Sequence, residues 1–424
     1  MICETFLVGL LPFTTKISVL SLLFKAGDRK ILDNFRPLSL TNVDYKIIAS
    51  VFAQRLRTVL PTIIHPDQSA CIKDRYIGCS LRNIIDIFEY YEENNLPGAL
   101  LCADFKQAFD SVEINFLLSV LRKMNFGENF IKWIQIFYTE PMFKVKNNGW
   151  VSQAYPLERS LRQGCPMSAS LFVIAIEALA LRIRQSENIN GIIIGNYEHR
   201  IIQYADDVTI CVTDTESIKH SLMIMSEFSS HAGPKLSFKK TKGIWLGSLK
   251  DTGLRLFENV VWTGNPVKVL GIYIGHDKQK CYMYNWTKRI ERTKSLATWW
   301  SKRRLTLHGK VYVLKTFLLS KIVFVASVLS VPDDVIKEMS SILYGYLWDN
   351  KRDKIKRSTV TRDILNGGIN MIDVNSFISS IKAAWVAKLI NIPGKWSSVF
   401  YSLCKDLGFK DHQIHVLGYV RSGS

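Results

Sequence analysis

The chain has 424 residues, of which 47% are hydrophobic and 22% charged, and its formal net charge is +18. This much apolar material excludes a mainly disordered chain, and the length corresponds to about three domains or subdomains. The eight cysteines form no Cys-x-x-Cys pair, which argues against a zinc ribbon and against a disulfide framework. So basic a globular protein is expected to bind a polyanion, such as nucleic acid or an anionic membrane surface.

The N-terminal region contains two short apolar runs, at residues 6–13 and 17–24. Neither reaches the roughly 18 residues of a membrane-spanning helix. Glu4 is the first charged side chain, whereas a signal peptide would begin with basic residues. We therefore expect no membrane partner and an intracellular location, in the nucleus or the cytoplasm.

Hydrophobic periodicity predicts both helices and strands in the first two thirds of the chain. Helical spacing of apolar residues occurs at 47–60, 81–91, 114–124 and 172–183. Apolar runs with strand character occur at 99–105, 192–195, 201–212 and 267–274. From residue 286 onward the pattern is mainly helical, with breaks at Pro332, Gly367 and Gly368. These patterns predict an α/β body followed by a mainly α C-terminal part.

The positive charge is concentrated in two short segments. Residues 350–362 hold six basic residues and one acidic residue. The larger segment, residues 286–321, holds ten basic residues and one acidic residue. Apolar residues at helical spacing run through it, so we expect helices with one buried and one cationic face. An ordinary solvated face is the alternative, but an excess of +9 in so short a segment favours phosphate binding. The candidate nucleic-acid contacts are Lys288, Arg289, Arg292, Lys302, Arg303, Arg304 and Lys310.

Aspartates stand where two apolar runs end. Asp104 follows the run at 99–103, and Asp206 with Asp207 interrupts the run at 201–212, which predicts a hairpin with carboxylates at its tip. Magnesium prefers oxygen ligands, and two ions held by shared carboxylates can support an in-line displacement at phosphorus. A polar turn or an exposed strand end would explain either motif alone.

Neighbouring side chains on a strand face opposite ways, so Asp206 and Asp207 can be equal ligands only if the turn splays them. We expect Asp104 and Asp206 to be the principal metal ligands and Asp207 to support them. A different role is expected for Asp110. Because Glu113 follows three residues later and an amphipathic run comes next, Asp110 is expected to cap a helix.

Three motifs occur in a characteristic order: Asp104-Phe-Lys-Gln-Ala-Phe-Asp110, Arg162-Gln-Gly-Cys-Pro-Met-Ser168 and Tyr204-Ala-Asp-Asp207. With them the chain resembles the reverse transcriptases of LINE-type, non-LTR retrotransposons. The resemblance implies an RNA-directed DNA polymerase that extends a DNA primer on an RNA template with deoxynucleotides, using two Mg2+ ions. A group II intron or telomerase polymerase fits less well, and a catalytically silent nucleic-acid-binding remnant is the alternative function.

The resemblance also implies a right-hand architecture. The fingers would occupy residues 1–95, a palm with an antiparallel sheet and part of the fingers 96–285, a helical thumb 286–330, and a helical C-terminal segment 331–424. Full elements of this type carry an endonuclease before the polymerase, a region that this chain is expected to lack.

Individual roles follow from the same resemblance. Asp104, Asp206 and Asp207 would bind the catalytic magnesium ions, and the backbone carbonyl of Phe105 would add a ligand. Phe109 falls where the family places a bulky ring beneath the sugar of the incoming nucleotide, although by itself it would be interpreted as a core aromatic.

The remaining implied roles concern the nucleotide and the leaving group. Gln163 and Gly164 would line the nucleotide pocket, with Ser168 capping the helix that follows. Arg36 would contact the triphosphate, Lys46 is a second candidate for that task, and Lys240 would protonate the pyrophosphate.

Overall fold

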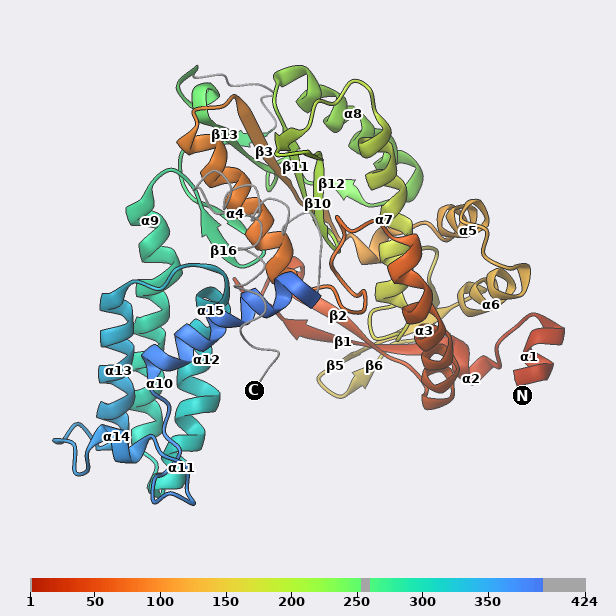
Figure 1. The fold of residues 1–424 in the computed structure, drawn as a ribbon. Coiled ribbons are helices and arrows are strands. Elements are labelled where there is room, and N and C mark those ends of the chain that lie inside the picture. The colour runs from red at the N-terminus through yellow and green to blue at the C-terminus, as the bar shows by residue number, and fades with distance from the viewer. Residues whose placement is uncertain (1, 253–259, 392–424) are drawn as a thin grey trace. The chain divides into compact units, whose positions relative to one another are not determined.

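The computed structural model describes residues 2–252 and 260–391, which form parts of two compact units (Figure 1). The first unit comprises Met1–Ser80 and Phe88–Trp262, and the second comprises Leu81–Ile87 and Thr263–Ser424. Strands and helices alternate in the first unit, whereas helices dominate the second. The predicted α/β body with a mainly helical C-terminal part is confirmed.

A five-stranded sheet is the centre of the first unit, in the order β10–β11–β3–β13–β14. Its strands are β3 (Gly98–Ala103), β10 (Ile201–Tyr204), β11 (Asp207–Val212), β13 (Lys242–Leu246) and β14 (Val261–Trp262). All neighbours are antiparallel except β13 and β14. The middle strand β3 is almost entirely buried, which explains why its sequence is a continuous apolar run rather than an alternating one.

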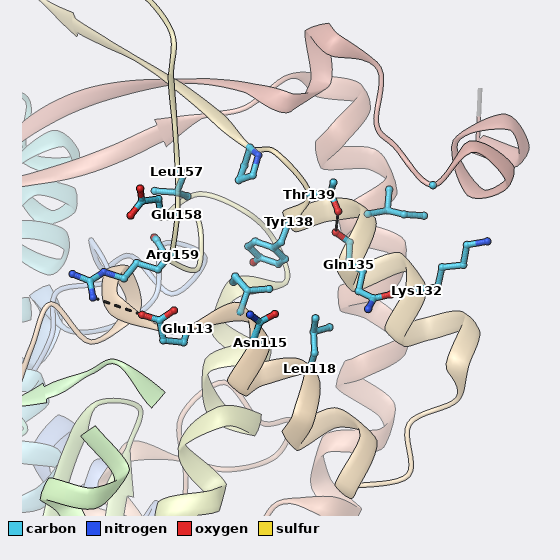
Figure 2. Close-up of a pocket in the computed structure, with 15 residues that line it drawn as sticks. Glu113, Asn115, Leu118, Lys132, Gln135, Tyr138, Thr139, Leu157, Glu158 and Arg159 are labelled. Carbon is cyan, nitrogen blue, oxygen red and sulfur yellow. Dashed lines mark hydrogen bonds and ion pairs between the residues drawn. The ribbon is translucent and has the colours of Figure 1, made fainter. Parts of the chain in front are cut away.

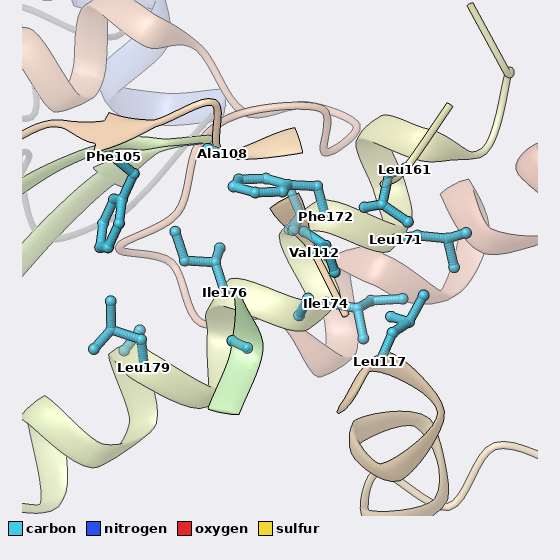
Figure 3. Close-up of a cluster of buried hydrophobic side chains, with 14 of the residues drawn as sticks. Phe105, Ala108, Val112, Leu117, Leu161, Leu171, Phe172, Ile174, Ile176 and Leu179 are labelled. Carbon is cyan, nitrogen blue, oxygen red and sulfur yellow. The ribbon is translucent and has the colours of Figure 1, made fainter. Parts of the chain in front are cut away.

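Helices pack against this sheet and against one another. The elements of the first unit that precede or flank the sheet are α1 (Ile2–Val8), α2 (Phe13–Lys16), α3 (Val43–Ile63), η2 (Phe109–Ser111), α5 (Ile114–Lys123), α6 (Glu128–Tyr138), α7 (Ser168–Gln185) and α8 (Thr215–Ala232). Helix α4 (Ile77–Glu93) is shared, because its residues Leu81–Ile87 belong to the second unit. Helix α7 contacts α3, α5, α8 and β10, and most of its side chains are buried because apolar residues surround its whole circumference. Figure 3 shows Phe172, Ile176 and Leu179 of α7 in the core below Phe105 and Ala108.

A second sheet lies in the same unit. It consists of β2 (Phe35–Leu40), β1 (Ile17–Phe24), β5 (Met142–Asn147) and β6 (Trp150–Val151), with β7 (Tyr155–Pro156) paired to β5. Strand β1 is antiparallel to β2 and parallel to β5. Two short strand pairs are also found in the described part of the first unit: β4 (Phe105–Lys106) with β12 (Lys235–Leu236), and β8 (Ile192–Ile194) with β9 (Tyr197–His199). The hairpin of β15 (Val267–Val269) and β16 (Ile272–Ile274) belongs to the second unit.

The second unit has its own hydrophobic core, formed mainly by helices. They are α9 (Lys278–Tyr282), η4 (Met283–Thr287), α10 (Lys288–Ser301), α11 (Leu307–Val313), η5 (Leu314–Leu319), α12 (Ser320–Val328), α13 (Asp333–Leu347), α14 (Arg357–Val360) and α15 (Val374–Asn391). Pro332 occupies the N-cap of α13, so the predicted break in the helical pattern is confirmed there.

One helical stretch, Leu307–Val328, is long and apolar enough to cross a membrane by length and composition, and 56% of its most apolar window is buried in the protein. Its residues Leu314, Leu318 and Ile322 belong to the core of the second unit. A buried core helix passes the same test, so this feature is weak support for a membrane segment.

Candidate active site

The three aspartates singled out in the sequence lie at one edge of the central sheet. Val208 pairs with Ala103 in the antiparallel pair of β11 and β3. The next positions, Asp207 at the start of β11 and Asp104 just after the end of β3, therefore lie beside each other. Tyr204 pairs with Asp207 across the two-residue turn that contains Asp206. The predicted hairpin with carboxylates at its tip is confirmed.

The carboxylates influence one another electrostatically. Burial and the charges of Asp206 and Asp104 raise the pKa of Asp207 to about 6. Burial and the charge of Asp104 also raise the pKa of Asp206, against the opposing effects of Arg36 and Lys25. The three carboxylates repel one another and offer oxygen atoms as ligands. A hard divalent cation such as Mg2+ prefers oxygen ligands, and its binding would relieve the repulsion. Within residues 2–252 and 260–391, however, no three acidic, histidine or cysteine side chains already form a closed metal-binding arrangement.

Two cations lie close enough to act on this site. Arg36 is exposed on β2, opposite Leu23 of β1, and Lys25 follows the end of β1. The charges of Arg36 and Lys25 therefore both act on Asp206, and Lys25 is an addition to the predicted site residues. Lys46 lies partly exposed on α3 and has no ion pair with a described residue.

Lys240 also lies beside the carboxylates. Its Nζ is 3.8 Å from Oδ2 of Asp104, and both side chains remain well exposed. The loop that carries Lys240 also forms hydrogen bonds with the backbone of Asp104. Ser237 N–H donates to the Asp104 carbonyl at 2.8 Å, and Asp104 N–H donates to Thr241 Oγ1 at 3.4 Å. An exposed pair of this kind adds little stability, so Lys240 stays free to move towards a bound anion.

Phe109 begins the 3-10 turn η2, five residues after Asp104, and packs against α7. Its ring stacks on Phe172 of α7, with centroids 4.2 Å apart and planes at 19°. The neighbouring Asp110 does not cap a helix, so that prediction was wrong. Asp110 lies in the 3-10 turn η2, whereas α5 begins only at Ile114 and has Glu113 as its N-cap.

The carboxylate of Asp110 binds Gln163 instead. Gln163 Nε2 donates to both carboxylate oxygens, at 2.9 and 2.8 Å, and burial raises the pKa of Asp110. Because the amide nitrogen is occupied, the orientation of the Gln163 side chain is fixed. No local pattern predicts this pair, because it joins residues 53 positions apart.

Gly164 has a conformation and a contact that require glycine. Its φ is +99°, and a Cβ at this position would lie 2.4 Å from the carbonyl oxygen of Ser39 on β2. Ser39 N–H donates to the Gln163 carbonyl at 3.0 Å, so the loop is attached to the edge of β2. Ser168 does not cap α7 as predicted. Its hydroxyl donates to the Arg162 carbonyl at 2.7 Å, which closes this loop.

The second unit contains the candidate nucleic-acid contacts. Five of the seven are exposed: Lys288, Arg292, Lys302, Arg303 and Arg304. The Arg303 guanidinium lies over the rings of Trp299 and Trp300, at 4.4 and 4.8 Å from their centroids. Cationic groups beside aromatic rings are suited to phosphates and bases together.

The other two candidates are used inside the unit. Lys310 is buried and donates to Asp349 at 2.6 Å and to the Leu347 carbonyl at 3.2 Å, so its prediction as a nucleic-acid contact was wrong. Its stem packs in the helical core, and its charge is neutralised there. Arg289 is half-buried, donates to the carbonyls of Gly271 and Lys321, and has its pKa lowered by burial.

A separate cavity of about 520 Å³ lies between α5, α6 and the loop at 157–160 (Figure 2). Glu113 and Arg159, which line it, form an ion pair at 3.6 Å. None of the predicted site residues lines this cavity. The candidate active site is therefore the sheet edge with the three aspartates.

Comparisons with known proteins agree with this geometry. The model of the family described as "Reverse transcriptase (RNA-dependent DNA polymerase)" matches residues 25–274. The chain is 26% identical over 440 residues to the "Transposon TX1 uncharacterized 149 kDa protein" of Xenopus laevis, covering 99% of this chain and 33% of that protein. It is 24% identical over 234 residues to the Pol polyprotein of the type-2 retrotransposable element R2DM of Drosophila melanogaster, covering 55% of this chain and 22% of the relative.

Among solved structures, a telomerase of Candida albicans matches at 11% identity and a TM-score of 0.47, covering 98% of this chain and 66% of the telomerase, a likeness too low to carry an argument. The chain spans about a third of the Xenopus relative and about a fifth of the Drosophila one. The family match covers more than half of the chain and includes all three motifs. The chain therefore belongs to the reverse transcriptase (RNA-dependent DNA polymerase) family, among the members found in non-LTR retrotransposons.

Proposed function

We propose that this chain catalyses RNA-directed DNA synthesis for a non-LTR retrotransposon, extending the 3′-hydroxyl of a DNA primer with deoxynucleotides on an RNA template. The observation that carries the proposal is the convergence of Asp104, Asp206 and Asp207 at the adjoining ends of β3 and the β10–β11 hairpin. The raised pKa values of Asp206 and Asp207 indicate a concentration of negative charge at this edge of the sheet.

The carboxylates of these three aspartates would hold two magnesium ions, with the backbone carbonyl of Phe105 as a further ligand. Such ions lower the pKa of a bound hydroxyl and stabilise charge on a leaving phosphate oxygen. In the reaction the primer 3′-oxygen forms a bond to the α-phosphorus, and the bond from that phosphorus to pyrophosphate breaks. Lys240 Nζ, next to Asp104, would give its proton to the pyrophosphate oxygen.

Other residues would position the nucleotide. Arg36 would bind the triphosphate, since its positive charge already lowers the pKa of Asp206 and so acts at this site. Lys46 is a second candidate. The ring of Phe109, supported by Phe172, would lie beneath the sugar and exclude a 2′-hydroxyl. Gln163, oriented by Asp110, and Gly164 would line the same pocket.

The exposed cations of the second unit would bind the phosphates of the template and primer strands. In this proposal residues 1–95 are fingers, 96–285 palm with part of the fingers, 286–330 thumb, and 331–424 a helical C-terminal segment, of which residues 392–424 lie outside the described structure. The protein would act in the nucleus or the cytoplasm.

Primer extension on poly(rA)/oligo(dT) tests the proposal. Asp206→Asn should abolish extension and leave template binding close to the wild-type value. The matched control is Glu187→Gln, which neutralises an exposed carboxylate on the loop after α7 and should keep both properties. Robust extension by Asp206→Asn would refute the assignment. A wild-type protein that binds the template and primer but adds no nucleotide would favour the alternative, a catalytically silent nucleic-acid-binding remnant.

A further inference from the structure

A segment distant in sequence completes the outer edge of the sheet next to the catalytic hairpin. Strand β10 is the edge strand, and residues 67–69 lie along it in parallel, with Gln68 opposite Gln203. Gln203 N–H donates to the Asp67 carbonyl at 2.8 Å, and Ser69 N–H donates to the Gln203 carbonyl at 3.1 Å. This short segment therefore lies one residue away from the turn that carries Asp206.

The side chain of Gln68 contacts the turn itself. Gln68 is completely buried, and its Oε1 accepts hydrogen bonds from the N–H groups of Ala205 and Ala70, both at 2.9 Å. Its Nε2 is directed at the Ala205 carbonyl oxygen at 3.5 Å. One buried amide thus faces both polar groups of the residue that immediately precedes Asp206.

Ala205 needs such a contact because its backbone is strained. Its φ is +54°, in the left-handed region that residues with a Cβ avoid. If the hydrogen bond to Gln68 were lost, Ala205 would relax towards negative φ and rotate the peptide that leads into Asp206. The carboxylate would then leave its place beside Asp104.

Gln68 is itself held in place. The Arg75 guanidinium donates to the carbonyls of Gln68 at 2.7 Å, His65 at 2.6 Å and Ile64 at 2.6 Å. The loop that presents the amide is therefore rigid before any substrate binds. A preorganised support of this kind is what keeps reacting groups in a productive geometry.

We propose that Gln68 is a positioning residue of the reverse transcriptase site, which acts by fixing the left-handed turn at Ala205 and thereby the carboxylate of Asp206. The inference rests on the proposed function, because it assigns to that site a residue that touches neither substrate nor metal. Glutamine suits the task because asparagine is too short to reach the turn, and glutamate would add a charge close to the three aspartates.

The test replaces the amide with an apolar group of similar length. Gln68→Met should lower kcat on poly(rA)/oligo(dT) about tenfold or more, because small misplacements of reacting groups are costly. The KM for the deoxynucleotide should stay within about threefold, because no contact with the nucleotide is removed. Affinity for Mn2+, measured by electron paramagnetic resonance on the nucleic-acid-free protein, should also fall.

The matched control is Gln203→Met. Gln203 is equally buried and lies opposite Gln68, but its amide has no hydrogen-bond partner among the described residues, so its replacement should leave kcat and Mn2+ affinity unchanged. The second comparison adds Ala205→Gly, since glycine adopts positive φ without strain. If Gln68 acts through the turn, Gln68→Met in the Ala205→Gly background should recover much of the lost kcat. If Gln68→Met alone does not fold, the double variant is compared with Ala205→Gly alone, and the two should have similar kcat.

Wild-type kcat and Mn2+ affinity in Gln68→Met would overturn the inference, as would a loss that Ala205→Gly does not relieve. Failure of the proposed function has a different signature. In that case the wild-type protein does not extend a primer, while Mn2+ binding still depends on Asp206 and still weakens in Gln68→Met.

Discussion

Gly164→Ala provides a quantitative test of the loop that joins the nucleotide pocket to β2. The new methyl group would meet two obstacles. At φ +99° a side chain is strained by about 1–2 kcal/mol. In addition, its Cβ would stand 2.4 Å from the Ser39 carbonyl oxygen, about 1 Å inside ordinary van der Waals contact.

The clash cannot be relieved by a flexible side chain, because the atom it meets belongs to the backbone. Moving Ser39 away would break its 3.0 Å hydrogen bond to the Gln163 carbonyl. Overpacking and the lost hydrogen bond together add about 2–3 kcal/mol, so we expect Gly164→Ala to destabilise the protein by about 3–5 kcal/mol in total. The thermal midpoint should fall by roughly 5 °C, because the unfolding entropy of a chain of 424 residues is large.

Gly149→Ala is the matched control. Gly149 has a similar φ of +86°, but no atom of the described residues lies within 4 Å of the added Cβ, so only the backbone strain of about 1–2 kcal/mol applies. Urea and thermal unfolding of both variants measure the difference. Because the Gln163 loop shifts, Gly164→Ala should also raise the KM for the deoxynucleotide. Equal destabilisation by the two substitutions would show that the contact with Ser39 is not a constraint.

Two further predictions concern charge. The raised pKa of Asp207, about 6, lies above the value of about 3.9 for an unfolded aspartate, so the metal-free protein should lose stability as the pH rises through this window. Magnesium binds the ionised carboxylate, so the gain in Tm on adding magnesium should be larger at about pH 8 than at about pH 5, and equal gains would contradict the assignment. Reversing Lys302, Arg303 and Arg304 to Glu should weaken template binding and reduce the slope of log K against log salt by about 2–3. The same reversal of exposed basic residues after α13 serves as control: Lys351, Arg352 and Lys354.

The sequence predicted those features that depend on local pattern. Apolar periodicity located α3, α5 and α7, and alternating apolar and turn residues located the β10–β11 hairpin with Asp206 at its tip. The apolar run at 267–274 predicts one strand. The structure has two short strands there, because Leu270 and Gly271 take positive φ and turn the chain.

The features that the sequence did not reveal depend on contacts between distant residues. Asp110 had the spacing of a helix cap, but its carboxylate is bound by Gln163, 53 residues away. Lys310 belonged to a cationic segment, but the helix that carries it turns this side chain towards Asp349. The role of Gln68 was not predicted, since a buried amide that binds a backbone turn has no characteristic spacing. Local pattern determines where a helix or strand forms, whereas the partner of a polar side chain is decided by packing.

The short segment alongside β10 also has a consequence for how the protein folds. The β10–β11 hairpin can form from neighbouring residues, but the hydrogen bond between Gln68 and Ala205 spans 137 residues, so its loop must close against a considerable entropic cost. Until that closure, β10 exposes an unpaired edge that another chain could extend. The same closure therefore completes the turn before Asp206 and covers the β10 edge, so a chain that has acquired its catalytic geometry no longer offers β10 for intermolecular strand addition.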